Sequence, residues 1–148
     1  MIKISRFISP ERIFFLSAQT REEVLQHMVD KLHTADQILD KELFYQAILD
    51  REHIVSTGIG MGVAIPHAKL AAYRNFFIAI AILQKGVNWN ALDDVPVRLI
   101  FMIGGPDYKQ TEYLQILSAI TLAIRDEERR KKILTLNSKE AIMQLFGN

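Results

Sequence analysis

The histidine at position 67 is the residue of this chain whose surroundings point most directly to chemistry. It follows Pro66, and before the proline stand three apolar residues and the glycines Gly58, Gly60 and Gly62 at alternate positions. Glycines let the backbone approach a ligand without interference from a Cβ atom, and a proline fixes the direction in which the chain continues. An ordinary imidazole is largely neutral near pH 7, so one ring nitrogen keeps a free lone pair. We therefore predict that His67 is a nucleophile that attacks a bulky anion such as a phosphoryl group.

The three glycines do not form a nucleotide-binding loop. A dinucleotide-binding fingerprint requires a helix directly after the glycines, and Pro66 blocks one there. A P-loop requires a lysine followed by serine or threonine, and no such pair follows. We interpret the glycines as turn and close-approach residues near the reactive histidine, and a purely structural role is equally open for each of them.

The composition is that of an ordinary globular domain. The chain has 148 residues, 49% of them hydrophobic, and a formal net charge of +1. This length and apolar content predict a single domain, residues 1–148, with a substantial core. The balanced charge argues against nucleic acid as a partner, and the basic run at 129–132 fits the solvated face of a helix better.

Several site types and locations are excluded or disfavoured. The chain has no cysteine, which rules out disulfides, thiolate zinc sites and a cysteine phosphocarrier within the chain. Its longest strongly apolar stretch, 76–83, is too short to cross a bilayer, and the N-terminal region lacks the pattern of a signal peptide. His27 and His33 are six positions apart, which places them on different helix faces and disfavours a shared metal. We expect a cytoplasmic chain with no metal and no cofactor.

Two helices are predicted before the histidine segment. Thr20 and Glu23 form a capping-box pattern, in which Glu23 reaches back to the start of the helix; this helix should bury Val24, Leu25, Met28 and Leu32. A second helix should follow Asp40 and end near Arg51-Glu52, with Leu43, Phe44, Ala47 and Ile48 inward. Arg51 would then lie at the mouth of the histidine segment.

Strands and further helices are predicted after the histidine segment. The segments 76–83 and 97–103 are apolar on both faces, as in strands covered on both sides, and Gly104-Gly105-Pro106 should stop the second. Helices should follow from about Lys109 to Ile124, after Asp126, and at Asn137-Ser138. Two groups of helices around buried strands indicate a layered α/β domain.

The segment from Glu52 to Ala68 resembles the phosphohistidine motif of the fructose/mannitol-type IIA proteins of the bacterial phosphotransferase system, a family that includes nitrogen-regulatory IIA proteins. Arg51, the Ile59-Gly60 pair and the run 63–68 also match that motif, and so do the stretches 86–89, 93–97 and 112–118. The resemblance spans most of the chain. It implies the family's fold, a three-layer α/β/α sandwich with a mixed β-sheet flanked by helices.

The resemblance also implies a function. His67 would accept a phosphoryl group from an HPr-like phosphocarrier protein and pass it to a cysteine of a IIB domain on another chain during sugar transport, so the chain would be peripheral to a membrane transporter at most. The alternative is a nitrogen-type regulatory protein whose phosphorylation state controls its binding to target proteins, which the short length favours. A scaffold without phosphoryl chemistry is disfavoured by the intact Arg51 and His67.

Two further site residues follow from the same motif. A phosphoryl group in transfer spreads negative charge over its equatorial oxygens, and the guanidinium of Arg51 matches that geometry. Tyr113 stands where the family usually has a second histidine. Its hydroxyl can donate a hydrogen bond to a phosphoryl oxygen, but it cannot become cationic. Ser56 and Thr57 can also donate, although capping of the loop explains them equally well.

Overall fold

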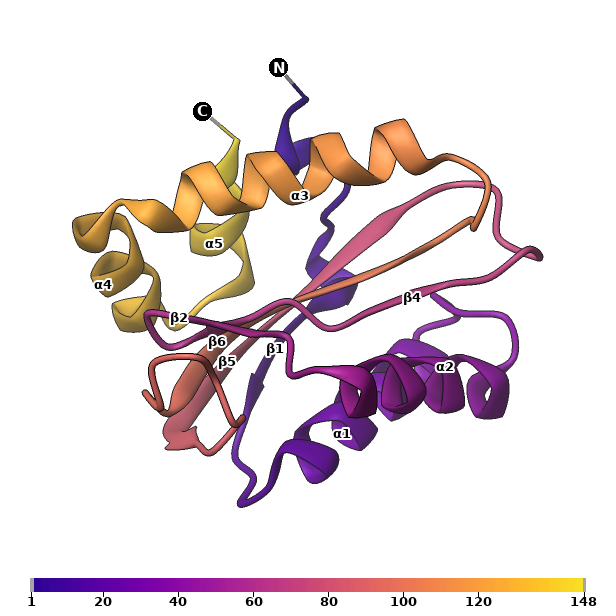
Figure 1. Cartoon of the computed structure of the whole chain (residues 1–148). Helices are drawn as coiled ribbons and strands as arrows, with labels where there is room; N and C mark the ends of the chain where they lie inside the picture. The colour runs from indigo at the N-terminus through magenta and orange to yellow at the C-terminus, as the bar shows by residue number, and fades with distance from the viewer. Residues whose placement is uncertain (1, 148) are drawn as a thin grey trace.

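A mixed sheet of six strands separates two layers of helices in the computed structural model, which describes residues 2–147 (Figure 1). The strand order is β1-β5-β6-β3-β2, and β4 also pairs with β6. The strands are β1 (Ile13–Leu16), β2 (Gly58–Gly60), β3 (Val63–Ala64), β4 (His67–Lys69), β5 (Phe77–Val87) and β6 (Val97–Gly105). The β5–β6 and β2–β3 pairs are antiparallel, whereas β1–β5, β3–β6 and β4–β6 are parallel.

Helices cover both faces of this sheet (Figure 1). One layer holds α1 (Arg21–Thr34) and α2 (Lys41–Ile54). The other holds α3 (Gln110–Arg125), α4 (Glu127–Thr135) and α5 (Lys139–Phe146), and the short 3₁₀ turns η1 (Ile4–Arg6) and η2 (Pro10–Arg12) precede β1 in the chain. The three-layer sandwich with a mixed sheet that the sequence predicted is confirmed.

The inner strand β5 shows why two separate cores form. Successive side chains of a strand point to opposite faces, and the alternation predicted for this segment is confirmed. One set packs with α3, α4 and α5, namely Phe76, Ile78, Ile80 and Ile82. The other set packs with α1 and α2, namely Phe77, Ala79, Ala81 and Leu83.

The helix starts follow the predicted capping residues. The Thr20 hydroxyl accepts a hydrogen bond from the Glu23 N–H at 3.1 Å, and the Asp40 carboxylate accepts one from the Leu43 N–H at 3.1 Å. The Glu23 carboxylate reaches back one residue further than expected, to the N–H of Gln19 at 3.4 Å.

Two expectations about helix α2 were wrong. The side chain of Leu43 is 51% exposed, because the inward face of α2 is set by Phe44 and Ile48. Helix α2 also continues to Ile54, beyond its expected end near Arg51-Glu52. The last helix begins where it was predicted, with Ser138 as its N-terminal cap.

The strand predicted over 97–103 extends two residues further, since Gly104 and Gly105 belong to β6 and pair with β4. Of the predicted stop Gly104-Gly105-Pro106, only Pro106 lies outside the strand. A Cβ atom at Gly104 would overlap the ring of Phe77, and one at Gly105 would overlap the ring of Phe76. Glycine therefore lets two aromatic rings pack against the end of the strand, and the strand ends at Pro106.

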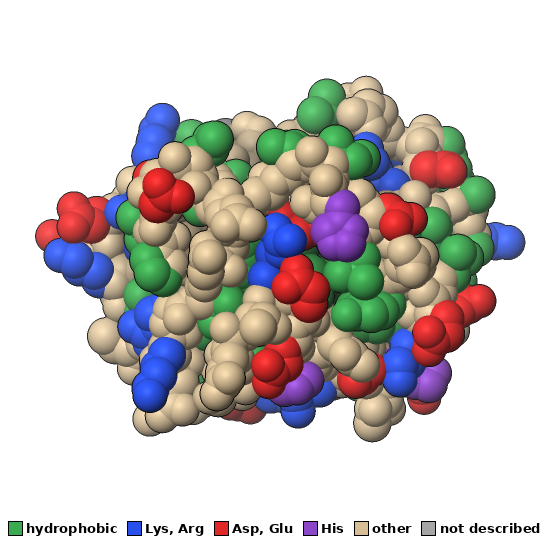
Figure 2. Space-filling view, turned by 60° about the horizontal axis from the view of Figure 1, so that its bottom comes forward, with side chains coloured by type: hydrophobic (Ala, Val, Ile, Leu, Met, Phe, Trp, Pro, Cys, Tyr) green, Lys and Arg blue, Asp and Glu red, His purple; other side chains and the backbone are tan. Residues whose placement is uncertain are grey.

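The outer face of α1 and α2 carries acidic and basic side chains close to one another (Figure 2). Lys41 and Asp30, for example, form an ion pair at 2.9 Å between the two helices. Within residues 2–147, none of the helices has the length and apolar character needed to cross a membrane.

Candidate functional site

His67 is the first residue of β4, and a break in the sheet places it there. β3 and β4 pair with successive parts of the same strand, β6, and Ile65-Pro66 lie between them. The Ile65 N–H donates to the Thr57 carbonyl at 3.0 Å instead of to β6. Pro66 has no N–H to donate, but its carbonyl accepts the Ile103 N–H at 2.9 Å. Pro66 thus occupies the interruption between β3 and β4 in the pairing with β6. The half-buried His67 follows it directly.

The imidazole of His67 is held in one orientation. Its Nδ1 atom lies 3.1 Å from the Ile65 carbonyl oxygen, which can only accept a hydrogen bond. We therefore assign the proton of the neutral ring to Nδ1, which leaves the lone pair on Nε2. Burial lowers the pKa of His67 below its usual value; the Ile65 carbonyl opposes this effect, and the charges of Arg51 and Lys69 add to it. The ring is thus neutral near pH 7, with a free lone pair on Nε2.

Tyr113, in the first turn of α3, lies beside this ring. The two ring centroids are 5.4 Å apart, with an angle of 47° between the ring planes. Tyr113 is only 5% exposed, and burial raises the pKa of its hydroxyl while Arg51 acts in the opposite direction. Within residues 2–147, no group forms a hydrogen bond with this hydroxyl.

Arg51 reaches the site from the last turn of α2, in the opposite layer of helices. Its Nη1 atom donates to the Val55 carbonyl at 2.9 Å, which steadies the side chain. Its charge affects the pKa of both His67 and Tyr113. No carboxylate of the described chain pairs with it. The structure therefore brings His67, Arg51 and Tyr113 to one site, with a cation available for an anion.

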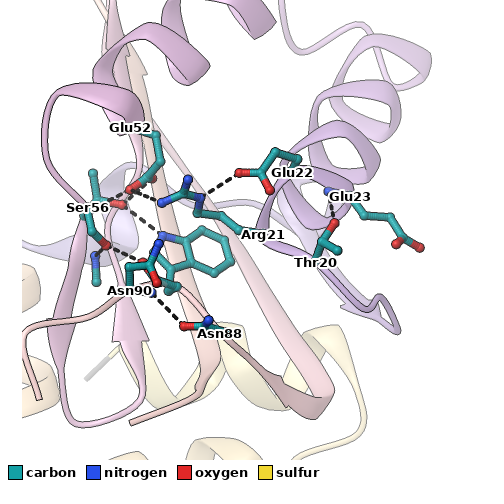
Figure 3. Close-up of polar contacts among 11 residues, drawn as sticks. Thr20, Arg21, Glu22, Glu23, Glu52, Ser56, Asn88 and Asn90 are labelled. Carbon is teal, nitrogen blue, oxygen red and sulfur yellow. Dashed lines mark hydrogen bonds and ion pairs between the residues drawn. The ribbon is translucent and has the colours of Figure 1, made fainter. Parts of the chain in front are cut away.

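A buried carboxylate fixes the loop between α2 and β2 (Figure 3). Glu52 is 2% exposed, and its two oxygens accept hydrogen bonds from the N–H and the hydroxyl of Thr57, each at 2.6 Å. The indole N–H of Trp89 donates to the same hydroxyl at 3.3 Å, and Arg21 approaches Glu52 at 3.9 Å. These contacts favour the loop-capping interpretation of Thr57 over a direct role at the phosphoryl group. Ser56 is engaged in the same way, because its hydroxyl donates to the Trp89 carbonyl at 2.5 Å.

A series of hydrogen bonds connects Glu52 to His67. Glu52 binds Thr57, the Thr57 carbonyl accepts the Ile65 N–H, and the Ile65 carbonyl contacts Nδ1 of His67. Sequence reasoning used Glu52 only to recognise the motif and missed this connection. The available signal was an acidic residue near the end of a helix, followed five residues later by Thr57 and Gly58.

Lys69 is the second residue that sequence reasoning missed. It stands two positions after His67 on the same strand, so the two side chains leave the same face of the sheet. Its Nζ atom lies 4.2 Å from the centroid of the Tyr113 ring. Its position two residues after His67 was the signal in the sequence that could have identified Lys69.

The alternating glycines serve the turn between β2 and β3. Gly60, Met61 and Gly62 all have positive φ, at 101°, 61° and 76°, a conformation that glycine adopts without steric cost. Asp93 accepts the Met61 N–H at 2.8 Å, and a Cβ at Gly60 would come within 3.1 Å of the same carboxylate. The structural role left open for these glycines is therefore observed at Gly60 and Gly62. No group of three potential metal ligands from His, Asp and Glu forms among the described residues.

Comparison with known proteins agrees with this geometry. Residues 6–148 match the family described as "Phosphoenolpyruvate-dependent sugar phosphotransferase system, EIIA 2". The chain belongs to this EIIA family. It is 35% identical over 147 residues to the fructose-specific EIIABC component of Bacillus subtilis, covering 99% of this chain but only 23% of that protein. It is 34% identical over 128 residues to the fructose-specific EIIA component of Haloferax volcanii, covering 86% of this chain and 83% of that protein.

Solved structures show that the EIIA fold is shared. The nitrogen regulatory protein IIA-Ntr from Neisseria meningitidis superposes with a TM-score of 0.90 at 24% identity, covering 97% of this chain and 98% of that one. The mannitol enzyme IIA of Escherichia coli, solved in complex with phosphorylated enzyme IIB, superposes with a TM-score of 0.79 at 23% identity, covering 95% and 96% of the two chains.

Proposed function

We propose that this chain is a phosphocarrier that accepts a phosphoryl group on Nε2 of His67 from an HPr-like phosphohistidine protein and passes it to a cysteine of a IIB domain. The observation that carries the proposal is the state of His67. Its Nδ1 atom is occupied by the Ile65 carbonyl, its pKa is lowered, and Arg51 stands close enough to affect it. Membership of the EIIA family and the IIA–IIB complex of the mannitol relative support the same direction of transfer.

The geometry suits an in-line exchange between two imidazoles. The bond from phosphorus to the donor's ring nitrogen breaks as a bond to Nε2 of His67 forms. A donor ring that carries a proton on its other nitrogen then leaves as neutral imidazole. His67 keeps its Nδ1 proton and becomes a phosphoimidazolium, whose positive charge the Ile65 carbonyl stabilises. Onward transfer breaks this bond and forms one to the thiolate sulfur of a cysteine, which must come from another chain.

The role of Arg51 in this proposal is to bind the equatorial oxygens of the phosphoryl group. A guanidinium offers paired donors in a plane, which match such oxygens. Because Arg51 forms no ion pair within the described residues, it can bind an anion without first breaking one.

Phosphorylation of the purified chain tests the proposal. Incubation with phosphoenolpyruvate, enzyme I and an HPr-like carrier should add one acid-labile phosphoryl group, and a IIB domain should then remove it. His67→Ala should take up no label, whereas His53→Ala, which alters an exposed histidine of the same region, should be labelled normally. Label retained by His67→Ala would overturn the assignment.

The alternative is a regulatory protein of the nitrogen type, which uses the same phosphorylated histidine to control its binding to target proteins. Tyr113 is the observation that favours it, because the usual second histidine is absent. The two functions separate at the second step. A phosphocarrier should lose its label to a IIB domain within the time of one turnover, whereas a regulator should keep it. Both functions imply a cytoplasmic location.

A further inference from the structure

The surroundings of Lys69 point to a second group that binds the phosphoryl anion. This inference rests on the proposed function of His67. Lys69 and His67 leave the same face of β4, with the buried Ala68 between them facing the other layer. Helix α3 covers the face that Lys69 and His67 share, and it contributes Gln110 and Tyr113 from its first turn. The ammonium of Lys69 is therefore held on the side of the sheet where the imidazole meets Tyr113.

Both contacts that hold this ammonium are neutral. Nζ donates a hydrogen bond to Oε1 of Gln110 at 3.1 Å and lies 4.2 Å from the centroid of the Tyr113 ring, within the range of a cation–π contact. No carboxylate oxygen lies within 4.0 Å of it in the part of the chain that the structure describes. Its charge is positioned but not neutralised.

Arg51, which comes from α2 in the opposite layer of helices, also lacks an ionic partner in the described part of the chain. Its guanidinium contacts a backbone carbonyl and has no carboxylate partner among residues 2–147. Burial lowers the pKa of His67, and the charges of Arg51 and Lys69 lower it further, because two unpaired cations beside the imidazole disfavour its protonation. Such an arrangement is stabilised when a dianion enters between the cations.

We propose that Lys69 binds the phosphoryl group on His67 from the side opposite Arg51, and that the ring of Tyr113 is the platform that holds the lysine there. Phosphate is a ligand that a lysine recognises as a point charge, while Arg51 recognises it through a planar fork. The cationic group that a histidine at position 113 would supply then comes from Lys69. On this view Tyr113 acts through its ring, and its hydroxyl is dispensable.

Four variants separate charge, ring and hydroxyl. Lys69→Gln removes the charge, Lys69→Arg keeps it, Tyr113→Phe keeps the ring, and Tyr113→Leu removes it. The readout is the single-turnover rate of His67 phosphorylation by an HPr-like donor. Lys85→Gln is the matched control, because Lys85 is an exposed lysine at the far end of β5, away from the end that pairs with Gly104.

Lys69→Gln should slow transfer by about tenfold to a hundredfold, the effect expected for one lost bond to a charged group. Lys69→Arg should retain most of the rate, and Lys85→Gln all of it. Tyr113→Phe should stay within about threefold of the parent, whereas a hydroxyl that bonds the phosphoryl group would cost about tenfold. Tyr113→Leu should slow transfer in the parent and add little in a Lys69→Gln background, because both changes remove one interaction.

A titration of His67 by NMR supplies a readout that a packing role would not change. Lys69→Gln should raise the pKa of His67, since a nearby positive charge is removed, and Lys69→Arg should leave it nearly unchanged. A parent rate and an unshifted pKa in Lys69→Gln would overturn the proposal while leaving the proposed function of His67 intact. Failure of the unsubstituted chain to take up any phosphoryl group would overturn both.

Discussion

At the residue scale, the surroundings of His67 set the pH range in which it can act. Only the neutral ring has a free lone pair, and burial together with two nearby cations lowers the pKa of His67 below the usual value of about 6.5. The neutral form should therefore persist to lower pH than in an ordinary histidine.

We expect the pKa of His67 in an NMR titration to lie below the usual histidine value of about 6.5. As the pH falls, the rate of phosphorylation should begin to drop at a lower pH than for a histidine of ordinary pKa, because the His67 ring stays neutral to lower pH. Arg51→Ala should raise the pKa of His67, because it removes a positive charge. A pKa of 6.5 or above in the unsubstituted chain would contradict this account of the site.

Arg51 gives a second prediction at this scale. Loss of a donor that stabilises developing charge costs on the order of 10²–10³ in rate, and Arg51→Ala should show a loss of this size in single-turnover phosphorylation. Arg51→Lys should recover only part of it, because a lysine lacks the planar fork. Within residues 2–147, this side chain forms one hydrogen bond, to the Val55 carbonyl, which is worth about 1 kcal/mol, so both variants should fold. An unchanged rate in a folded Arg51→Ala protein would leave the arginine with a structural role alone.

The sequence was most informative about residues whose role depends on a local pattern. His67, Arg51 and Tyr113 are recognisable because they lie in motifs, and the structure brings all three together. Lys69 and Glu52 required three-dimensional information. A lysine two positions after a histidine is informative only once that segment is known to be a strand and α3 is known to cover it. The importance of Glu52 depends on its burial against Thr57 and Trp89.

At the scale of elements, the loop between α2 and β2 depends on Glu52. Replacing it with glutamine should weaken both bonds to Thr57, because the amide can no longer accept at both positions. A hydrogen bond to a charged group contributes about 1.5–3 kcal/mol, and we expect Glu52→Gln to lower the free energy of unfolding by about that amount. Phosphorylation should also slow, because the Thr57 carbonyl accepts the Ile65 N–H and the Ile65 carbonyl orients the ring of His67.

Urea unfolding and single-turnover phosphorylation measure the two effects. Asp50→Asn is the matched control, since it is an acid-to-amide change at an exposed position of the same helix. It should change stability by less than about 0.5 kcal/mol. If Glu52→Gln had the same free energy of unfolding and the same phosphorylation rate as this control, the hydrogen bonds from Glu52 to His67 would not contribute to function.

The elements themselves were predictable to different degrees. Long elements with capping residues or continuous apolar runs, such as α1, β5 and β6, were predicted from their pattern. The strands β2, β3 and β4 were not, because they have three, two and three residues. Such segments are too short for a period to show, and the glycines of β2 and the proline just before β4 are residue types more typical of turns. They form because β6 offers its edge to both β3 and β4.

At the scale of the whole molecule, the site joins the two layers of helices. Arg51 comes from α2 below the sheet in Figure 1, Tyr113 comes from α3 above it, and His67 lies on the strand between them. The buried side chains nevertheless form two clusters that share no residue, one on each face of the sheet. The geometry of the site thus depends on two cores that the sheet keeps apart.

This separation predicts additive effects on stability. Ile48 is buried in the cluster of α2, and Ile120 is buried in the cluster of α3. Ile48→Ala should lower the free energy of unfolding by about 2–5 kcal/mol and Ile120→Val by about 0.5–1.5 kcal/mol. Because the two positions have no shared neighbours, the double variant should equal the sum within about 0.5 kcal/mol. Urea unfolding of the three proteins tests this, with Ile120→Val plus Ile124→Val as a pair within one cluster that is expected to couple. A coupling above about 1 kcal/mol between Ile48 and Ile120 would mean that the sheet transmits packing changes between the layers, and the site would then respond to changes in either core.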